Sequence, residues 1–184
     1  MIGKKRLALG AFLLLVLAAA TPAPAPTPDK GPDKGSDKAP DKGSVTGLPL
    51  PRFAALRSDD VNLRVGPGTR YPISWVYKRR GLPVEIEREF DVWRLIRDSE
   101  GTEGWVHEAT LTGRRTLLII GGEQTLRGTA ADNAPAVARL APGVIGRISH
   151  CTANDPWCEV EIKGYHGFLP RAAFWGSFPG EAVN

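Results

Sequence analysis

The sequence lacks a long hydrophobic run and has few cysteines. Its most apolar stretch, residues 7–20, has 14 residues, fewer than the ~20 that an α-helix needs to cross a bilayer. No cysteine follows this stretch closely, which excludes a lipid-modified N-terminus because the acceptor thiol is missing. The stretch follows Lys4, Lys5 and Arg6 and ends in three alanines. This pattern is typical of a secretory signal.

We therefore predict a signal peptide over residues 1–20, cleaved near Ala20, with Ala23 and Ala25 as alternative sites. The expected location is periplasmic or secreted, without stable membrane insertion after cleavage. The alternative is an uncleaved segment that anchors the protein in the membrane.

The larger part of the chain has little net charge. The formal charge of +4 comes mostly from residues 1–20, because residues 52–184 hold 17 basic and 16 acidic side chains. A nucleic-acid-binding protein usually needs a net basic face, so nucleic acid is not expected as a partner. The short clusters Lys78-Arg79-Arg80 and Arg114-Arg115 are interpreted as solvated turns.

The sequence displays no catalytic arrangement. It has no Ser-His-Asp set, and Gly121-Gly122 is not followed by the Lys-Ser/Thr of a phosphate loop. His107 and Glu108 are adjacent in a predicted strand, where alternation places them on opposite faces. We predict no enzymatic activity, no cofactor and no metal.

Residues 21–51 have almost no large apolar side chains and are predicted to be a disordered spacer. The first part alternates proline with small residues, and the second repeats Asp-Lys-Gly units. Such a composition does not offset the entropy of ordering. A sharper alternative is that the proline-rich part docks into a groove of the folded region.

The folded region, from residue 52, consists of short apolar runs separated by Gly, Pro, Asn and Asp. These runs have the length and composition of strands, and no stretch has helical periodicity over three turns. The fold class is therefore all-β. The region also repeats itself at an offset of 62 to 64 residues. The matching positions are Leu63-Arg64 and Leu126-Arg127, Gly81 and Gly143, Trp93 and Trp157, 104–106 and 167–169, and Leu111 and Phe174.

The first copy carries a motif set that resembles bacterial SH3 domains. The set is Val61-Asn-Leu-Arg64, Gly66-Pro-Gly68, Tyr71-Pro-Ile, 81–86, Trp93 and Gly104-Trp105-Val106. The resemblance implies two tandem small SH3-like β-barrels, over residues 52–113 and 114–177, with a tail over 178–184. The second copy is degenerate, since it lacks the Gly-Pro-Gly and has Phe168 in place of tryptophan.

The resemblance also implies a long first loop, residues 64–77, and a binding role toward peptidoglycan or peptides. A shallow groove between this loop and the Trp93 strand is the expected site. The candidate ligand-binding residues are Arg64, Tyr71, Trp75, Tyr77, Trp93 and Trp157, with Arg70 as an alternative carboxylate partner. Core or loop packing is the alternative for the aromatic residues, a structural bond to a loop carbonyl is the alternative for Arg64, and Trp105 is expected to close the core.

The strand 157–162 alternates clearly. Cys158, Val160 and Ile162 share one face, which must be the core face, and Trp157 lies on the opposite face. The two cysteines flank Asn154-Asp155-Pro156, a typical turn. In an exported protein they favour a disulfide between Cys151 and Cys158. A metal site that also uses His150 and His166 is the alternative.

The sequence thus predicts an exported, non-catalytic binding module whose partner is a cell-wall peptide or an extended peptide of an envelope protein. The alternative function is a structural envelope protein whose barrels mediate protein–protein contacts without a peptide groove.

Overall fold

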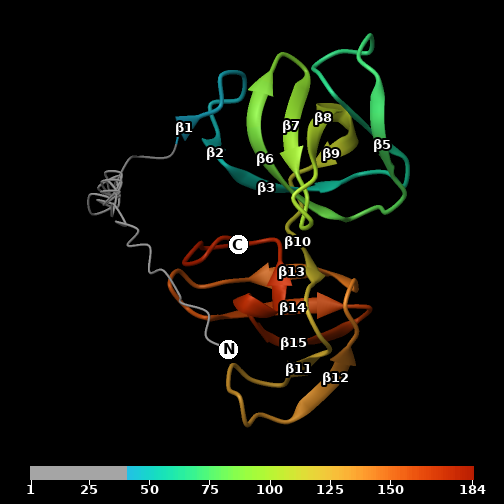
Figure 1. Cartoon of the computed structure of the whole chain (residues 1–184). Coiled ribbons are helices and arrows are strands. Elements are labelled where there is room, and N and C mark those ends of the chain that lie inside the picture. The colour runs from blue at the N-terminus through green and yellow to red at the C-terminus, as the bar shows by residue number, and fades with distance from the viewer. Residues whose placement is uncertain (1–40) are drawn as a thin grey trace, which may run out of the picture. The chain divides into compact units, whose positions relative to one another are not determined.

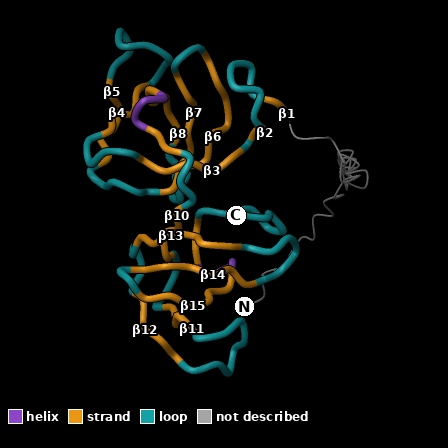
Figure 2. The backbone as a smooth tube through the Cα atoms, turned by 180° about the vertical axis from the view of Figure 1, so that it is seen from behind, coloured by secondary structure: helices purple, strands orange, loops and turns teal. Residues whose placement is uncertain are grey.

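The computed structural model of the protein describes residues 41–184. The predicted signal peptide and the first part of the predicted spacer lie outside these residues. Within them no helix has the length and apolar character that crossing a membrane requires. Strands and loops make up nearly all of the described chain (Figure 2), and its helical elements are the two short 3-10 turns η1 and η2. The elements are β1 (Asp41–Lys42), β2 (Pro49–Leu50), β3 (Arg52–Leu56), β4 (Val61–Arg64), β5 (Ile73–Tyr77), β6 (Pro83–Phe90), β7 (Trp93–Arg97), β8 (Glu103–His107), η1 (Glu108–Thr110), β9 (Leu111–Thr112), β10 (Thr116–Ile119), β11 (Gln124–Arg127), β12 (Ala136–Leu140), β13 (Ile145–His150), β14 (Trp157–Ile162), β15 (Tyr165–Pro170), η2 (Arg171–Ala173) and β16 (Phe174–Trp175).

The first copy of the repeat forms one antiparallel sheet in the order β5-β4-β8-β7-β6-β3-β9 (Figure 1). Side chains alternate along each strand, and one set from each strand meets in a single core. Leu63, Val84, Ile96 and Val106 are completely buried there. The predicted all-β, SH3-like architecture is confirmed for this copy.

The second copy repeats this arrangement strand for strand. Its order is β12-β11-β15-β14-β13-β10-β16, and each strand occupies the place of its counterpart in the first sheet. Cys158, Val160 and Ile162 are buried in its core while Glu159 is exposed. The predicted alternation of the 157–162 strand is therefore confirmed.

Strand β10 contributes to both cores. Leu117 and Ile119 lie in the core of the second sheet, whereas Leu118, between them, lies in the core of the first. Phe53 of β3 also packs edge-on against the Trp175 ring, with 5.1 Å between the ring centroids. The two copies therefore share apolar contacts as well as a covalent connection.

Part of the predicted spacer is ordered. Residues 41–50 contain the paired strands β1 and β2, and Leu50 is buried in the first core. Gly43 lies close to the Glu89 carboxylate, and a Cβ at this position would lie 2.4 Å from Glu89 Oε2. The composition of this segment conceals its order, because one buried charge and the single buried apolar residue Leu50 hold it.

Glu89 is the residue that holds the segment. Its carboxylate accepts hydrogen bonds from the Val45 N–H at 3.0 Å, the Thr46 N–H at 2.9 Å and the Thr46 hydroxyl at 2.6 Å. The Arg52 guanidinium lies 2.6 Å away, and the side chain of Glu89 is fully buried. Burial by itself disfavours the charged form, but these donors outweigh it and lower the pKa of Glu89 to about 2.

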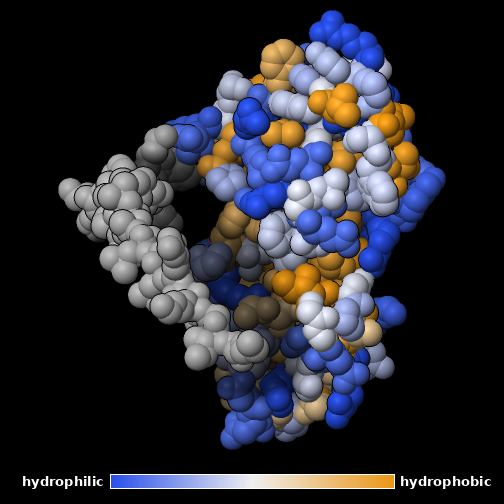
Figure 3. Space-filling view, viewed as in Figure 1, coloured by the Kyte–Doolittle hydropathy of each residue, from blue (hydrophilic) through white to orange (hydrophobic). Residues whose placement is uncertain are grey.

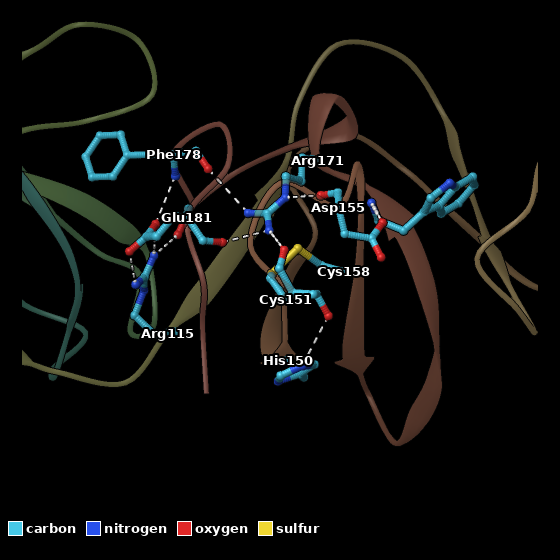
Figure 4. The surroundings of a disulfide bond; sticks show 11 residues. Arg115, His150, Cys151, Asp155, Cys158, Arg171, Phe178 and Glu181 are labelled. Carbon is cyan, nitrogen blue, oxygen red and sulfur yellow. Dashed lines mark hydrogen bonds and ion pairs between the residues drawn. A yellow bond between two sulfur atoms is a disulfide. The ribbon is translucent and has the colours of Figure 1, made fainter. Parts of the chain in front are cut away.

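The disulfide between Cys151 and Cys158 is present, as predicted (Figure 4). The predicted tail, 178–184, packs beside it. Val183 is buried in the second core and exchanges two backbone hydrogen bonds with Cys151, at 2.9 and 3.0 Å. The tail is thus part of the second barrel.

Arg171 and Arg115 secure this tail (Figure 4). The Arg171 guanidinium donates to the carbonyls of Thr152 and Asp155 in the disulfide loop and to that of Glu181 in the tail, at 2.7 to 2.8 Å. Arg115 donates to both carboxylate oxygens of Glu181, at 2.6 and 2.9 Å. Burial opposes ionisation of Glu181, but these hydrogen bonds outweigh it and lower its pKa.

The substitution Glu89→Gln is expected to lower the free energy of unfolding at pH 7 by roughly 2–3 kcal/mol, because it removes a buried charge from its donors. The folded-state pKa of about 2 lies below the value of 4.5 for an unperturbed carboxyl. The stabilisation is therefore complete above about pH 4.5 and disappears as the pH falls toward 2. Denaturant unfolding at pH 7 and pH 3 measures it. The exposed Glu159→Gln is the control, and an equal loss at both pH values contradicts the prediction.

Reducing the disulfide is expected to release two thiols and to lower the free energy of unfolding by about 2–3 kcal/mol, because an unlinked short loop has more freedom when unfolded. Denaturant unfolding with and without reductant measures the loss. In the double variant Cys151→Ala/Cys158→Ala, reductant should have no effect. A free thiol in the unreduced, unfolded protein would contradict the assignment.

Candidate functional site

The hairpin of β4 and β5 carries a loop, residues 65–72, that Arg64 holds in place. The Arg64 guanidinium donates to the carbonyl of Thr69 at 3.2 Å and to that of Tyr71 at 2.7 Å. The Tyr71 ring fills the turn, where a Cβ on Gly66 would lie 2.6 Å from Tyr71 Cδ1. Arg64 and Tyr71 therefore shape the loop, which was the structural alternative for Arg64.

Strand β5 presents an exposed apolar edge beside this loop. It is the terminal strand of its sheet, so one row of its backbone N–H and C=O groups lacks a neighbouring strand. Trp75 is 58% exposed on it, and Ile73 and Val76 are exposed as well. Hydrophobic side chains are visible at the surface over this strand (Figure 3). An exposed tryptophan on an open strand edge is a surface that an extended chain can bind.

A hollow of about 490 Å³, here named the Trp75 hollow, adjoins this strand. Charged residues of both signs line it. Lys78 and Arg79 follow β5, whereas Asp98 and Glu100 come from the turn between β7 and β8. The full lining is Trp75, Val76, Tyr77, Lys78, Arg79, Leu82, Asp98, Ser99, Glu100, Thr102 and Leu118.

Tyr77 forms the buried wall of the Trp75 hollow. Its hydroxyl donates to Asp98 Oδ2 at 2.8 Å, and Asp98 Oδ1 accepts the N–H groups of Glu100 and Thr102, each at 2.9 Å. Burial, followed by the hydrogen bond to Asp98, raises the pKa of Tyr77 above its ordinary value. Tyr77 thus fixes the turn that bears Glu100 and offers little surface of its own.

Trp93 lies outside the Trp75 hollow, whereas the sequence predicted that both residues line one groove. It is buried, and its ring meets that of His107 edge-on with 5.5 Å between centroids. It does not line the Trp75 hollow. Trp105 also differs from expectation, because Val106 occupies the core while Trp105 is half-buried and pairs with Leu95 on the other face. Without the strand register, the sequence did not reveal which face these aromatic residues occupy.

The second barrel does not repeat the exposed tryptophan. Leu63 pairs with Trp75 in the first barrel, and the corresponding Leu126 pairs with Ala138 in the second. Its own Trp157 is half-buried beside Pro170, and the Trp157 backbone N–H donates to Asp155 Oδ1 at 2.9 Å. The loop-holding arginine does recur, because Arg127 donates to the Ala134 carbonyl at 2.8 Å. The second barrel thus retains the strand arrangement and the loop-holding arginine, but it lacks the exposed tryptophan of the edge strand.

The metal alternative finds no support in the described residues. Both cysteines lie in the disulfide, which removes the thiolates that a site with His150 and His166 would use. In residues 41–184, no three His, Cys, Asp or Glu side chains gather as a metal ion would require.

Comparison with known proteins supports the repeat. The family model described as bacterial SH3 domain matches residues 57–113 and again residues 121–176. A comparison with curated proteins finds no match.

Two solved structures share low similarity with the chain. NlpC1 from Trichomonas vaginalis is 12% identical over 74% of this chain and 49% of its own, with a TM-score of 0.31. NlpC2 from the same organism is 11% identical over 69% of this chain and 48% of its own, with a TM-score of 0.32. The chain thus spans about half the length of each, and similarity this low supports no argument.

The substitution Tyr77→Phe is expected to lower the free energy of unfolding by roughly 1–3 kcal/mol, because the buried Asp98 carboxylate loses a donor. Denaturant unfolding at pH 7 measures the change. Tyr165→Phe removes the same hydroxyl from an exposed ring and should have no effect. Equal effects of the two substitutions would show that the Asp98 contact contributes nothing.

Proposed function

The chain belongs to the bacterial SH3 domain family, and we propose that it is a non-catalytic module that binds a short extended peptide of the cell wall. The proposed site is the Trp75 hollow and the adjoining edge of β5. Domains of this family are binding modules, and each of the two regions that match the family forms one SH3-like barrel. The site lies in the first of them.

The exposed indole of Trp75 is the observation that carries this proposal. More than half of this large flat side chain is exposed, so a bound chain that covers it gains apolar burial. The charges of the hollow fit the same ligand. A short peptide has an ammonium group, which the carboxylate of Glu100 in this hollow complements.

The open edge of β5 supplies a second means of recognition. An extended peptide that lies along a terminal strand hydrogen-bonds to its backbone, while alternate side chains enter neighbouring hollows. In the second barrel, the equivalent strand β12 has Ala138 where β5 has Trp75. The first barrel is therefore the proposed binder, and the second a supporting frame.

The proposed setting is the periplasm or the exterior of the cell. The motivation is the basic, apolar and small-residue pattern of residues 1–20. The disulfide agrees with it, because such bonds persist in oxidising compartments.

A structural role in protein–protein contacts is the second candidate function. Phe90 and Tyr165 are large exposed side chains outside the Trp75 hollow, and either can mark a contact with another protein.

Isotope-labelled protein titrated with soluble peptidoglycan fragments should show resonance shifts at β5 and at 98–102. The substitution Trp75→Ala should weaken binding about tenfold, because it removes the aromatic surface that the ligand covers. Tyr165→Ala removes an exposed ring from the second barrel and is the matched control.

Absence of shifts at millimolar ligand would refute the peptide site. Binding that Tyr165→Ala weakens and Trp75→Ala leaves intact would refute the Trp75 site and move the peptide site to the second barrel. Turnover of the fragments, lost on a single substitution, would overturn the non-catalytic assignment.

A further inference from the structure

The two basic clusters, Lys78-Arg79-Arg80 and Arg114-Arg115, differ in how their side chains are used. Three of the five side chains have partners. Lys78 pairs with Asp60, Arg79 donates to the Gly143 carbonyl at 2.5 Å, and Arg115 binds Glu181. Within residues 41–184, the guanidinium groups of Arg80 and Arg114 have neither a hydrogen bond nor an ion pair. These two remain available for a ligand.

The fold brings the two available arginines to one hollow. Arg80 and Arg114 are 34 positions apart in sequence, yet both line a hollow of about 410 Å³ together with Arg57. Arg57 donates its Nε–H to the Leu111 carbonyl at 3.1 Å, which orients its exposed side chain. Three arginines from separate segments therefore line one hollow.

A second hollow of about 310 Å³ extends this surface. It shares Arg114 with the first and adds Arg147 of β13 and Ser149. Arg147 is exposed on the strand that pairs with β10. Of the residues in the described part of the chain that line the two hollows, none is Asp or Glu.

Two of the carboxylates close to these hollows are already bonded, and a third, Glu161, stands opposite Arg147 across the β13–β14 pair without lining either hollow. Asp59 accepts the backbone N–H of Arg80 at 3.1 Å, and Glu181 binds Arg115. Neither lines a hollow. Arg57, Arg80, Arg114 and Arg147 together form what we call the arginine surface.

We propose that the arginine surface binds the phosphate groups of a flexible anionic polymer. Guanidinium groups match phosphate oxygens with paired hydrogen bonds, and four of them over two adjoining hollows suit several phosphates along one chain. The surface shares no residue with the Trp75 hollow, so it is a second, independent site.

The linings also indicate which phosphate polymer fits. Within the described residues neither hollow has an aromatic lining residue, so nucleic-acid bases would have no ring to stack on. The charges line hollows rather than a flat face, which suits a flexible chain better than a bilayer surface. The fitting partner is a phosphate polymer without bases.

Inorganic polyphosphate is the probe that tests this proposal. Calorimetric titration at several salt concentrations should show binding that weakens with salt. The double substitution Arg80→Gln/Arg114→Gln should weaken binding about tenfold at low salt and reduce the slope of log K against log salt by about 2. The matched control is Arg88→Gln/Arg139→Gln, which removes two exposed charges outside the surface and should leave both quantities unchanged.

Three outcomes would overturn the proposal. The first is equal weakening by the two double variants, which would indicate a general charge effect. The second is tighter binding to oligothymidylate than to polyphosphate, which would indicate a nucleic-acid site. The third is binding to phosphatidylglycerol vesicles, but not to polyphosphate, that depends on Arg80 and Arg114, which would indicate a membrane surface.

Discussion

Charged side chains with several hydrogen bonds each hold the loops of both barrels, and the surfaces described above depend on them. Cores of this size bury the strands and leave little apolar surface to secure the segments between them. Arg64 therefore fastens the first loop, Arg171 the disulfide loop and the C-terminal segment, and Glu89 the segment before β3. Each of these charges bonds two or more polar groups of the segment that it holds, so its removal is expected to destabilise that segment. Trp75 stands exposed on a strand whose loop is fixed in this way.

The two barrels show how one frame carries different surfaces. Strand order, register and the loop-holding arginine are repeated, as Arg64 and Arg127 illustrate. The residue that faces outward on the edge strand is not, since Trp75 is replaced by Ala138. Packing restricts the residues that form the repeated frame, whereas the solvent-exposed residue of the edge strand can change without disturbing the core. The arginine surface takes Arg57 and Arg80 from the first repeat and Arg114 and Arg147 from the second.

Much of the fold was predictable because it rests on local patterns. The repeat, the strand class and the alternation around Val160 follow from patterns along the chain, and the Cys151–Cys158 disulfide follows from an even number of cysteines in a protein expected to be exported. The candidate site was predictable only in part, because exposure depends on register. Trp93 and Trp75 are both tryptophans in predicted strands, yet Trp93 is buried and Trp75 is exposed. The order of residues 41–50 rests on a carboxylate more than 35 positions away, and the meeting of Arg80 with Arg114 is likewise non-local.

Strand β10 joins the cores of the two repeats. Its alternate side chains enter different cores, with Leu118 in one and Leu117 and Ile119 in the other. A shift of this strand by one position would exchange those sets and disturb both cores at once. Dividing the chain just before it would expose Leu118 together with Trp175, which packs against the first core. The repeat that is so plain in the sequence is therefore a poor guide to where the chain can be cut.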